Sequence, residues 1–213
     1  EIELVTGNNQ PTGVATHTST TNSITLPLVF GTYYKVYVRA VCSGNTSAWV
    51  VSDQFTPLLP GTDCNSAIDI TSLPYTHSDT TANYGDDYNG QPGTSCGITG
   101  NYLSGDDVVY AYTPNENMVI NVELIPQGTY SGIFIYDSCA NIGVSCLAGV
   151  ANVNANVRNI NNLSLIGGTT YYFLISTRTQ PQSVQYTLNI QRVFCAEPIN
   201  LTATNPTLTS TQL

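Results

Sequence analysis

The chain has 213 residues, of which only 9% are charged, and its net charge is −9. Its 5 Lys and Arg residues are too few for the clustered positive charge on which binding to nucleic acid or an anionic membrane surface depends. No run of about 18 apolar residues is present, so we expect no membrane insertion. The acidic balance is typical of an exported protein and is compatible with divalent cations.

Strand signals recur along the chain as short runs of Val, Ile, Tyr and Thr between Gly, Asn, Pro and Asp residues. The chain opens with a strand-like EIELVTG and without Met, which we interpret as the interior of a longer polypeptide. Alternating runs follow at 33–41, 108–114, 118–126, 132–137, 169–177 and 184–191. Helix signals are nearly absent, so this spacing predicts an all-β chain of Ig-like or jelly-roll-type antiparallel β-sandwiches in a row.

Two proline-marked segments divide the chain. TPLLPGTDC (56–64) and CAEPINL (195–201) each follow a strand-like run and combine proline with a cysteine. We therefore expect three parts, residues 1–57, 58–194 and 195–213.

Six cysteines favour an oxidising compartment and structural disulfides. They are Cys42, Cys64, Cys96, Cys139, Cys146 and Cys195. A zinc site is the alternative, but it needs short C-x-x-C pairs or paired histidines. The closest cysteines are Cys139 and Cys146, and the histidines are His17 and His77, so we expect disulfides rather than metal.

The middle cysteines predict two local bridges. Cys139 and Cys146 flank the short ANIGVS loop, which a bridge between them would staple. A second bridge, Cys64 to Cys96, would tie the start of the middle part to the GQPGTSCG loop. Such a bridge stabilises a fold by about 2–4 kcal/mol because it restricts the unfolded chain.

The run LVFGTYYKVYVRA (28–40) joins a leucine and a Gly-Thr turn to an alternating strand that opens with tyrosine. Residues 1–57 thereby resemble the second half of a fibronectin type III domain, although Phe30 stands where that family usually has proline. In a strand, alternate side chains share one face of the sheet. The face toward the other sheet would carry Tyr34, Val36, Val38, Ala40 and Cys42.

Residues 195–213, with a proline before an alternating run and a Thr/Ser-rich turn, resemble the opening of the same domain type. In its cysteine-bearing version, the resemblance implies a bridge from the first strand to the end of strand F. Cys42 and Cys195 would then each pair with a cysteine of another copy outside residues 1–213. A direct Cys42–Cys195 bond is the alternative.

The middle part, residues 58–194, resembles the pre-peptidase C-terminal type of β-sandwich. The matching motifs are Cys64-Asn65-x-Ala67, GDDVVY (105–110), GIFIYDSC (132–139) and GTTYYFLI (168–175) followed by YTLNI (186–190). The family occurs beside secreted peptidases, polysaccharidases and adhesins, so the resemblance implies a secreted accessory or adhesive role.

Two acidic clusters are candidates for a structural calcium ion, the one cofactor that the sequence leaves open. The candidate ligands are Asp86, Asp87, Asn89, Asp106 and Asp107. Calcium prefers several oxygen ligands from such loops, but Gly85 and Cys96 stand where an EF-hand pattern needs its first and last ligands. The alternative is that these Asp residues cap turns through their own backbone.

Tyrosines in or near loops are candidates for ligand contact, because an aromatic ring with a polar group can stack on a sugar. We select Tyr84, Tyr88 and Tyr102, while Tyr75 and Tyr130 share the same setting. The alternative is that these rings pack turns between the sheets.

No nucleophile motif, zinc-protease motif or phosphate loop is present, so the sequence predicts no enzyme. The best interpretation is a structural or adhesive segment of a long exported protein at a bacterial cell surface, with type IX-type export implied by the resemblance. Its partners would be neighbouring domains and a surface polysaccharide or another cell-surface protein. The alternative is an accessory carbohydrate-binding or anchoring region of a secreted hydrolase.

Overall fold

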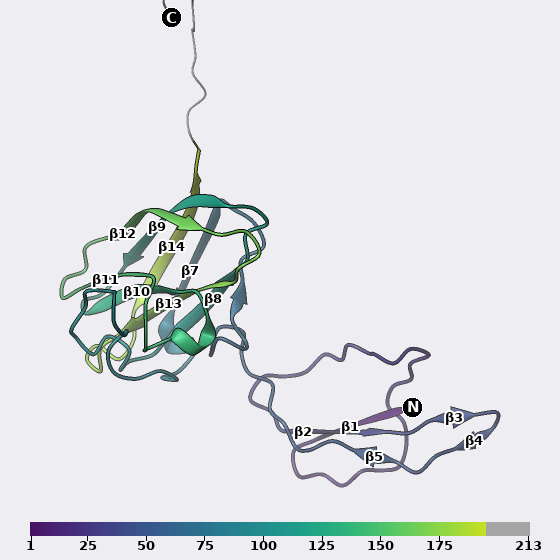
Figure 1. Cartoon of the computed structure of the whole chain (residues 1–213). Helices are drawn as coiled ribbons and strands as arrows, with labels where there is room; N and C mark the ends of the chain where they lie inside the picture. The colour runs from purple at the N-terminus through teal and green to yellow at the C-terminus, as the bar shows by residue number, and fades with distance from the viewer. Residues whose placement is uncertain (195–213) are drawn as a thin grey trace, which may run out of the picture.

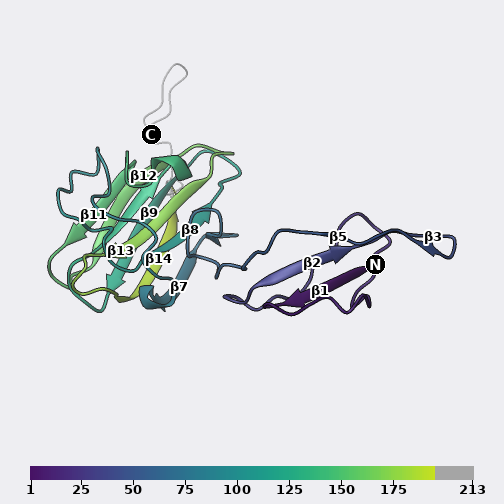
Figure 2. The ribbon, with the colours of Figure 1, turned by 90° about the horizontal axis from the view of Figure 1, so that it is seen from below.

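The computed structural model describes residues 1–194, and the predictions for Cys195 and for residues 195–213 lie outside this range. The described chain consists of strands, loops and two short 3-10 turns, η1 (Thr81–Asn83) and η2 (Cys139–Asn141), so the prediction of an all-β fold is confirmed. Residues 1–57, here called the N-terminal module, and residues 58–194, the sandwich module, share no strand. Figures 1 and 2 show the two modules apart from each other, joined by one connecting segment. The structure contains no helix in the described residues that is long and apolar enough to cross a membrane.

The N-terminal module is built on one three-stranded antiparallel sheet. Its strand order is β1 (Ile2–Thr6), β2 (Tyr34–Val38), β5 (Val50–Val51), and a small hairpin of β3 (Val41–Cys42) and β4 (Asn45–Thr46) extends beyond it. Its buried apolar side chains are Ile2, Val5 and Tyr34.

The expected inward face of β2 is buried only in part. Tyr34 is buried, and its hydroxyl accepts a hydrogen bond from the Val29 N–H at 3.0 Å. Val38, however, is 46% exposed, and Ala40 and Cys42 are exposed, so the expectation of a covered face is wrong for these three residues. The physical reason is that no second sheet of the described residues covers this end of the strand.

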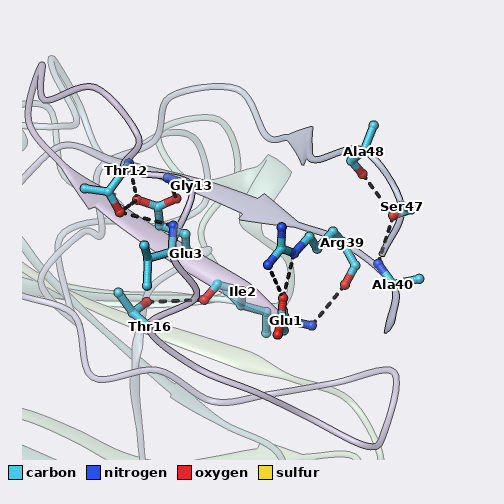
Figure 3. A network of polar contacts seen from close by, with 11 residues as sticks. Glu1, Ile2, Glu3, Thr12, Gly13, Thr16, Arg39, Ala40, Ser47 and Ala48 are labelled. Atoms are coloured by element: carbon cyan, nitrogen blue, oxygen red, sulfur yellow. Dashed lines mark hydrogen bonds and ion pairs between the residues drawn. The ribbon is translucent and has the colours of Figure 1, made fainter. Parts of the chain in front are cut away.

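The edge strand β1 of this sheet carries a buried carboxylate, Glu3, which binds the loop that follows the strand. Figure 3 shows Glu3 of β1 pointing at the Thr12–Gly13 loop. Its Oε1 accepts hydrogen bonds from the Thr12 N–H (2.5 Å) and hydroxyl (2.7 Å), and its Oε2 accepts one from the Gly13 N–H (2.9 Å). Burial alone would raise the pKa of Glu3, but these hydrogen bonds outweigh it and hold the pKa below its usual value.

The sandwich module consists of two packed sheets (Figure 1). The five-stranded sheet has the order β11 (Ala148–Asn152), β10 (Ser131–Tyr136), β13 (Tyr171–Thr177), β8 (Val108–Tyr112), β6 (Ile68–Asp69). The four-stranded sheet has the order β12 (Arg158–Leu165), β9 (Met118–Pro126), β14 (Gln185–Val193), β7 (Tyr75–Thr80). All pairs are antiparallel except β6–β8, which is parallel. Alternating apolar residues of both sheets form the core between them.

Several polar side chains in or beside that core form hydrogen bonds with one another. The Tyr110 hydroxyl lies 2.7 Å from His77 Nδ1 and 2.5 Å from the Tyr186 hydroxyl. The Tyr84 hydroxyl donates to Asp79 Oδ2 at 2.6 Å. These bonds satisfy groups that would otherwise be costly to bury.

The five-stranded sheet is buried on its outer face as well, which explains why β10 is apolar or small at every position. The segment between η1 and β8, residues 84–107, crosses this face and is here called the covering loop. Its Tyr102 and Leu103 pack with Phe134 and Leu174 of the sheet in a second apolar cluster. The Tyr136 hydroxyl donates to the Pro92 carbonyl at 2.9 Å and ties sheet and loop together.

Both disulfide pairings expected from the sequence are wrong. The bridges are Cys64–Cys139 and Cys96–Cys146, with Cα–Cα separations of 5.7 and 5.4 Å. The covering loop runs beside residues 144–146, where Thr94 N–H donates to the Val144 carbonyl at 3.0 Å and Cys146 N–H donates to the Thr94 carbonyl at 3.0 Å. This pairing places Cys96 next to Cys146, so the bridges join segments that are distant in sequence.

Candidate functional site

The end of the sandwich module where β10 begins and β13 ends carries an open cleft. Because Ser131 pairs with Thr177 in the antiparallel ladder, the residues just outside it, Tyr130 and Arg178, lie opposite each other. The backbone N–H of Arg178 donates a hydrogen bond to the backbone carbonyl of Tyr130 at 3.1 Å. The covering loop supplies the other wall through residues 99–101.

The cleft has a volume of about 700 Å³, within the roughly 300–1,000 Å³ of common ligand sites. Its lining is Thr99, Gly100, Asn101, Tyr130, Arg178, Thr179 and Gln180. These residues supply hydroxyl, amide and guanidinium groups and one aromatic ring, but no carboxylate, imidazole or thiol. The cleft therefore offers hydrogen bonding and stacking rather than acid–base or nucleophilic chemistry.

The three arginines of the sandwich module differ in what they contact. Arg158 is buried, and its guanidinium donates to backbone carbonyls of Ser131, Asn152, Asn154 and Asn156. Arg192 forms an ion pair with Glu116 at 2.7 Å on the surface.

The side chain of Arg178 pairs with neither a backbone carbonyl nor a carboxylate among the described residues, and its buried Nε makes no hydrogen bond. Its guanidinium carbon instead lies 4.8 Å from the ring centroid of Tyr102 and 5.5 Å from that of Tyr130. Of the three arginines of the sandwich module, Arg178 is thus the one whose side chain has no hydrogen-bond or ion-pair partner among residues 1–194, and it lines the cleft.

The three tyrosines selected from the sequence do not present free rings at this site. Tyr84 is 9% exposed and belongs to the core between the sheets, and Tyr102 is 5% exposed beneath Arg178. Tyr88 is half-buried, and its hydroxyl accepts a hydrogen bond from the Cys64 N–H at 3.0 Å. The premise of exposed rings is therefore wrong for Tyr84 and Tyr102, and the ring that lines the cleft belongs to Tyr130.

Among the acidic candidates, Asp107 is the buried carboxylate. Asp107 has no exposed surface, and its Oδ2 accepts hydrogen bonds from the N–H groups of Asp87 (2.9 Å) and Tyr88 (3.0 Å). Its Oδ1 is buried without a partner among the described residues. Burial raises the pKa of Asp107 to about 8, although the two backbone hydrogen bonds act in the opposite direction.

The other acidic candidates do not converge on Asp107. Asp106 Oδ1 accepts a hydrogen bond from Gln182 Nε2 at 3.1 Å, and Asn89 Oδ1 accepts one from the Ser104 hydroxyl at 2.8 Å. Asp86 and Asp87 are exposed in the loop. Within residues 1–194 no three His, Cys, Asp or Glu side chains gather in a way that could hold a metal ion. The five residues thus fit a calcium ion poorly, and calcium binding stays a prediction.

No protein-family model matches the chain, and no curated protein matches it. Among solved structures, the chain is similar to a pre-peptidase C-terminal domain of a collagenase from Bacillus anthracis, with 15% identity and a TM-score of 0.37. That similarity covers 58% of this chain and 93% of the collagenase domain. A GH26-CBM35 β-(1,4)-mannanase from Podospora anserina matches at 10% identity and a TM-score of 0.33, over 62% of this chain and 31% of its own.

A family 6 carbohydrate-binding module matches at 13% identity and a TM-score of 0.30, over 58% of this chain and 86% of the module. Similarity at these levels identifies neither a ligand nor an activity for this chain, so its function is argued from its own residues. The fibronectin type III assignment of residues 1–57 stays a prediction.

Proposed function

We propose that this chain is a non-enzymatic binding and spacing segment of an exported, multidomain protein. The observation that supports this role best is the construction of the loop face of the sandwich module. Two disulfides, Cys64–Cys139 and Cys96–Cys146, attach the covering loop and its neighbours across the five-stranded sheet. A loop fixed in this way can present the cleft without losing much conformational freedom on binding.

The setting inferred for this segment is extracellular. Disulfides persist in oxidising compartments, and the low charge leaves a surface of Thr, Asn, Ser and Tyr that salt affects little. We infer a bacterial cell surface reached by type IX-type export, as the resemblance implies. The partners would be neighbouring domains of the same polypeptide and a surface polysaccharide or another surface protein.

The test is adhesion under flow. The oxidised chain, coupled to beads, is expected to stay on surfaces coated with bacterial polysaccharide, to lose this retention after reduction with dithiothreitol, and to leave the polysaccharide chemically unchanged. Release of new reducing ends, or equal loss of the oxidised beads and of beads without protein, would overturn the proposal.

The second candidate is the accessory region of a secreted hydrolase. It would use the same cleft and differs in the domains joined to the chain in the full-length protein. Peptide mass spectrometry of the native polypeptide distinguishes the two, because further sandwich repeats support the adhesive segment and a catalytic domain supports the accessory region.

A further inference from the structure

The side chain of Arg178, which lines the cleft, makes no hydrogen bond or ion pair with residues 1–194. Among residues 1–194 its buried Nε has no hydrogen-bond acceptor, and neither ion pair of these residues includes it. A buried donor that stays unpaired costs free energy, and hydrogen bonds between a guanidinium and an anion are among the stronger ones in proteins. The rest of the guanidinium likewise has no hydrogen-bonding partner among residues 1–194, and Arg178 lines the cleft, where an anionic acceptor from outside the chain can pair with it.

The surroundings hold the guanidinium in position. Gly100 lies directly against the Arg178 guanidinium and the Tyr102 ring, so a Cβ at this position would force these side chains to shift. Tyr130, on the other side, has a φ of +53°, a conformation that few side chains other than Asn and Asp adopt. Such backbone is kept where the surrounding structure enforces it.

The remaining lining narrows the chemistry of the ligand. Asn101, Thr99, Thr179 and Gln180 provide neutral donors and acceptors, and Tyr130 provides part of a ring face. A saccharide presents hydroxyl groups to such side chains and a C–H face to an aromatic ring, whereas an apolar peptide anchor would need aliphatic lining. The single cation suits one carboxylate better than the several charges of a phosphate-rich or sulfate-rich polymer.

We propose that the cleft between residues 99–101 and 178–180 binds a carboxylate-bearing sugar, a uronate residue of an acidic polysaccharide, with its carboxylate on Arg178. This inference rests on the proposed binding role of the segment and names the ligand class of its cleft. The net charge of −9 repels long polyanions, so short oligosaccharides at about 0.15 M salt, where charges more than about 8 Å apart are screened, are the appropriate probe.

The experiment is calorimetric titration of the full chain with oligogalacturonate and with the same oligosaccharide after its carboxyl groups have been reduced to alcohols. Arg178→Gln is expected to weaken oligogalacturonate binding by about tenfold to hundredfold, as expected for losing a charge-assisted hydrogen bond. Arg178→Lys keeps the positive charge but lacks the paired N–H donors of a guanidinium, so it should bind oligogalacturonate more tightly than Arg178→Gln and less tightly than the wild type. Arg192→Gln is the matched control, because it removes the same charge from an ion pair elsewhere and should leave binding unchanged.

Backbone amide NMR shifts at residues 99–101 and 178–180 would place the ligand and would show that each variant stays folded. Equal binding of the carboxyl-reduced oligosaccharide would overturn the uronate assignment while leaving the adhesive role intact. Equal binding of oligoglutamate or of a sulfated glycan would also overturn the uronate assignment, because it would show that the cleft recognises negative charge and not a sugar. Absence of binding to any of these probes, in a chain that still adheres in the bead assay, would remove the cleft from the adhesive surface.

Discussion

The two modules of this chain stabilise similar β-sheets by different means. In the sandwich module the five-stranded sheet is covered on one face by the four-stranded sheet and on the other by the covering loop. In the N-terminal module the buried apolar side chains are Ile2, Val5 and Tyr34, and a carboxylate, Glu3, is buried beside them. Apolar layers and disulfides therefore stabilise the sandwich module, whereas hydrogen bonds contribute a larger part of the stability of the N-terminal module. A mutation in one module should therefore lower the stability of that module alone.

The sequence supplies a probe for this comparison. Its one tryptophan, Trp49, lies in the N-terminal module, where the Arg39 guanidinium carbon is 4.4 Å from the ring centroid. Trp49 fluorescence thus follows the unfolding of that module alone, whereas calorimetry follows both.

The largest effect is expected from Phe134→Ala. Phe134 is fully buried on the outer face of the five-stranded sheet, and truncating such a ring costs about 3–5 kcal/mol through lost burial and the cavity that remains. The calorimetric transition of the sandwich module should move to lower temperature while the Trp49 transition stays in place. Tyr34→Ala, which removes a buried ring from the N-terminal module, should do the reverse. Movement of the Trp49 transition with Phe134→Ala would show that the modules unfold together.

The next effect concerns the bridge that attaches the covering loop. Replacing Cys96 and Cys146 with serine should destabilise the sandwich module by about 2–4 kcal/mol, because the bridge closes a loop with a sequence separation of 50. Protease cleavage should then begin within residues 84–107. Cys42→Ser, which changes an exposed cysteine that has no disulfide partner among residues 1–194, is the control and should alter neither measurement. An unchanged cleavage pattern in the double variant would mean that apolar packing alone holds the loop.

The strands that the sequence predicted are those with alternating or continuous Val, Ile, Tyr and Phe. The runs at 118–126 and 132–137 correspond closely to β9 and β10. Among the strands that were missed, β7 exposes Thr and Ser and carries His77 on its inward face, and β12 exposes Asn and Ser. In β12 a change of register between Ile160 and Leu163, with Asn162 at a φ of +56°, also interrupts the alternation.

The site was predicted less well than the strands because it depends on contacts across the fold. Spacing along the chain favoured a Cys139–Cys146 bridge, but the path of the covering loop over the sheet decides the pairing. Tyr102 and Tyr130 share the same sequence context, and only the packing shows which ring is buried. That Arg178 has no acidic partner among residues 1–194 likewise depends on the folded surface, and no local sequence pattern predicts it.

Asp107→Asn tests how the stability of the sandwich module depends on pH. The folded-state pKa of Asp107 is about 8, above its usual 3.8, so the protonated form stabilises the sandwich module. That stability is fully present below about pH 4 and is lost as the pH rises toward 8, by at least about 1 kcal/mol between pH 5 and pH 8. Asparagine keeps an acceptor for the two backbone N–H groups and should remove this pH dependence, as measured by urea unfolding in EDTA.

The same titration tests the calcium prediction. A bound calcium ion would favour the ionised carboxylate, so added calcium should stabilise the wild-type module near pH 8 and leave Asp107→Asn unaffected. Identical unfolding curves with calcium and with EDTA would remove calcium from this loop and leave Asp107 as a buried turn residue.

The smallest effect is expected at Glu3, and it has the opposite sign. The hydrogen bonds from Thr12 and Gly13 hold the folded-state pKa of Glu3 below its usual 4.5, so its contribution is present above that pH and is lost as the pH falls below it. Acidification should therefore lower the Trp49 transition temperature, and Glu3→Gln should flatten this response. Glu116→Gln, an exposed ion-pair residue of the sandwich module, is the control and should leave the Trp49 transition unchanged. If Glu3→Gln also leaves it unchanged at pH 7, packing of Ile2, Val5 and Tyr34 holds the N-terminal module, and the contrast between the modules is one of degree.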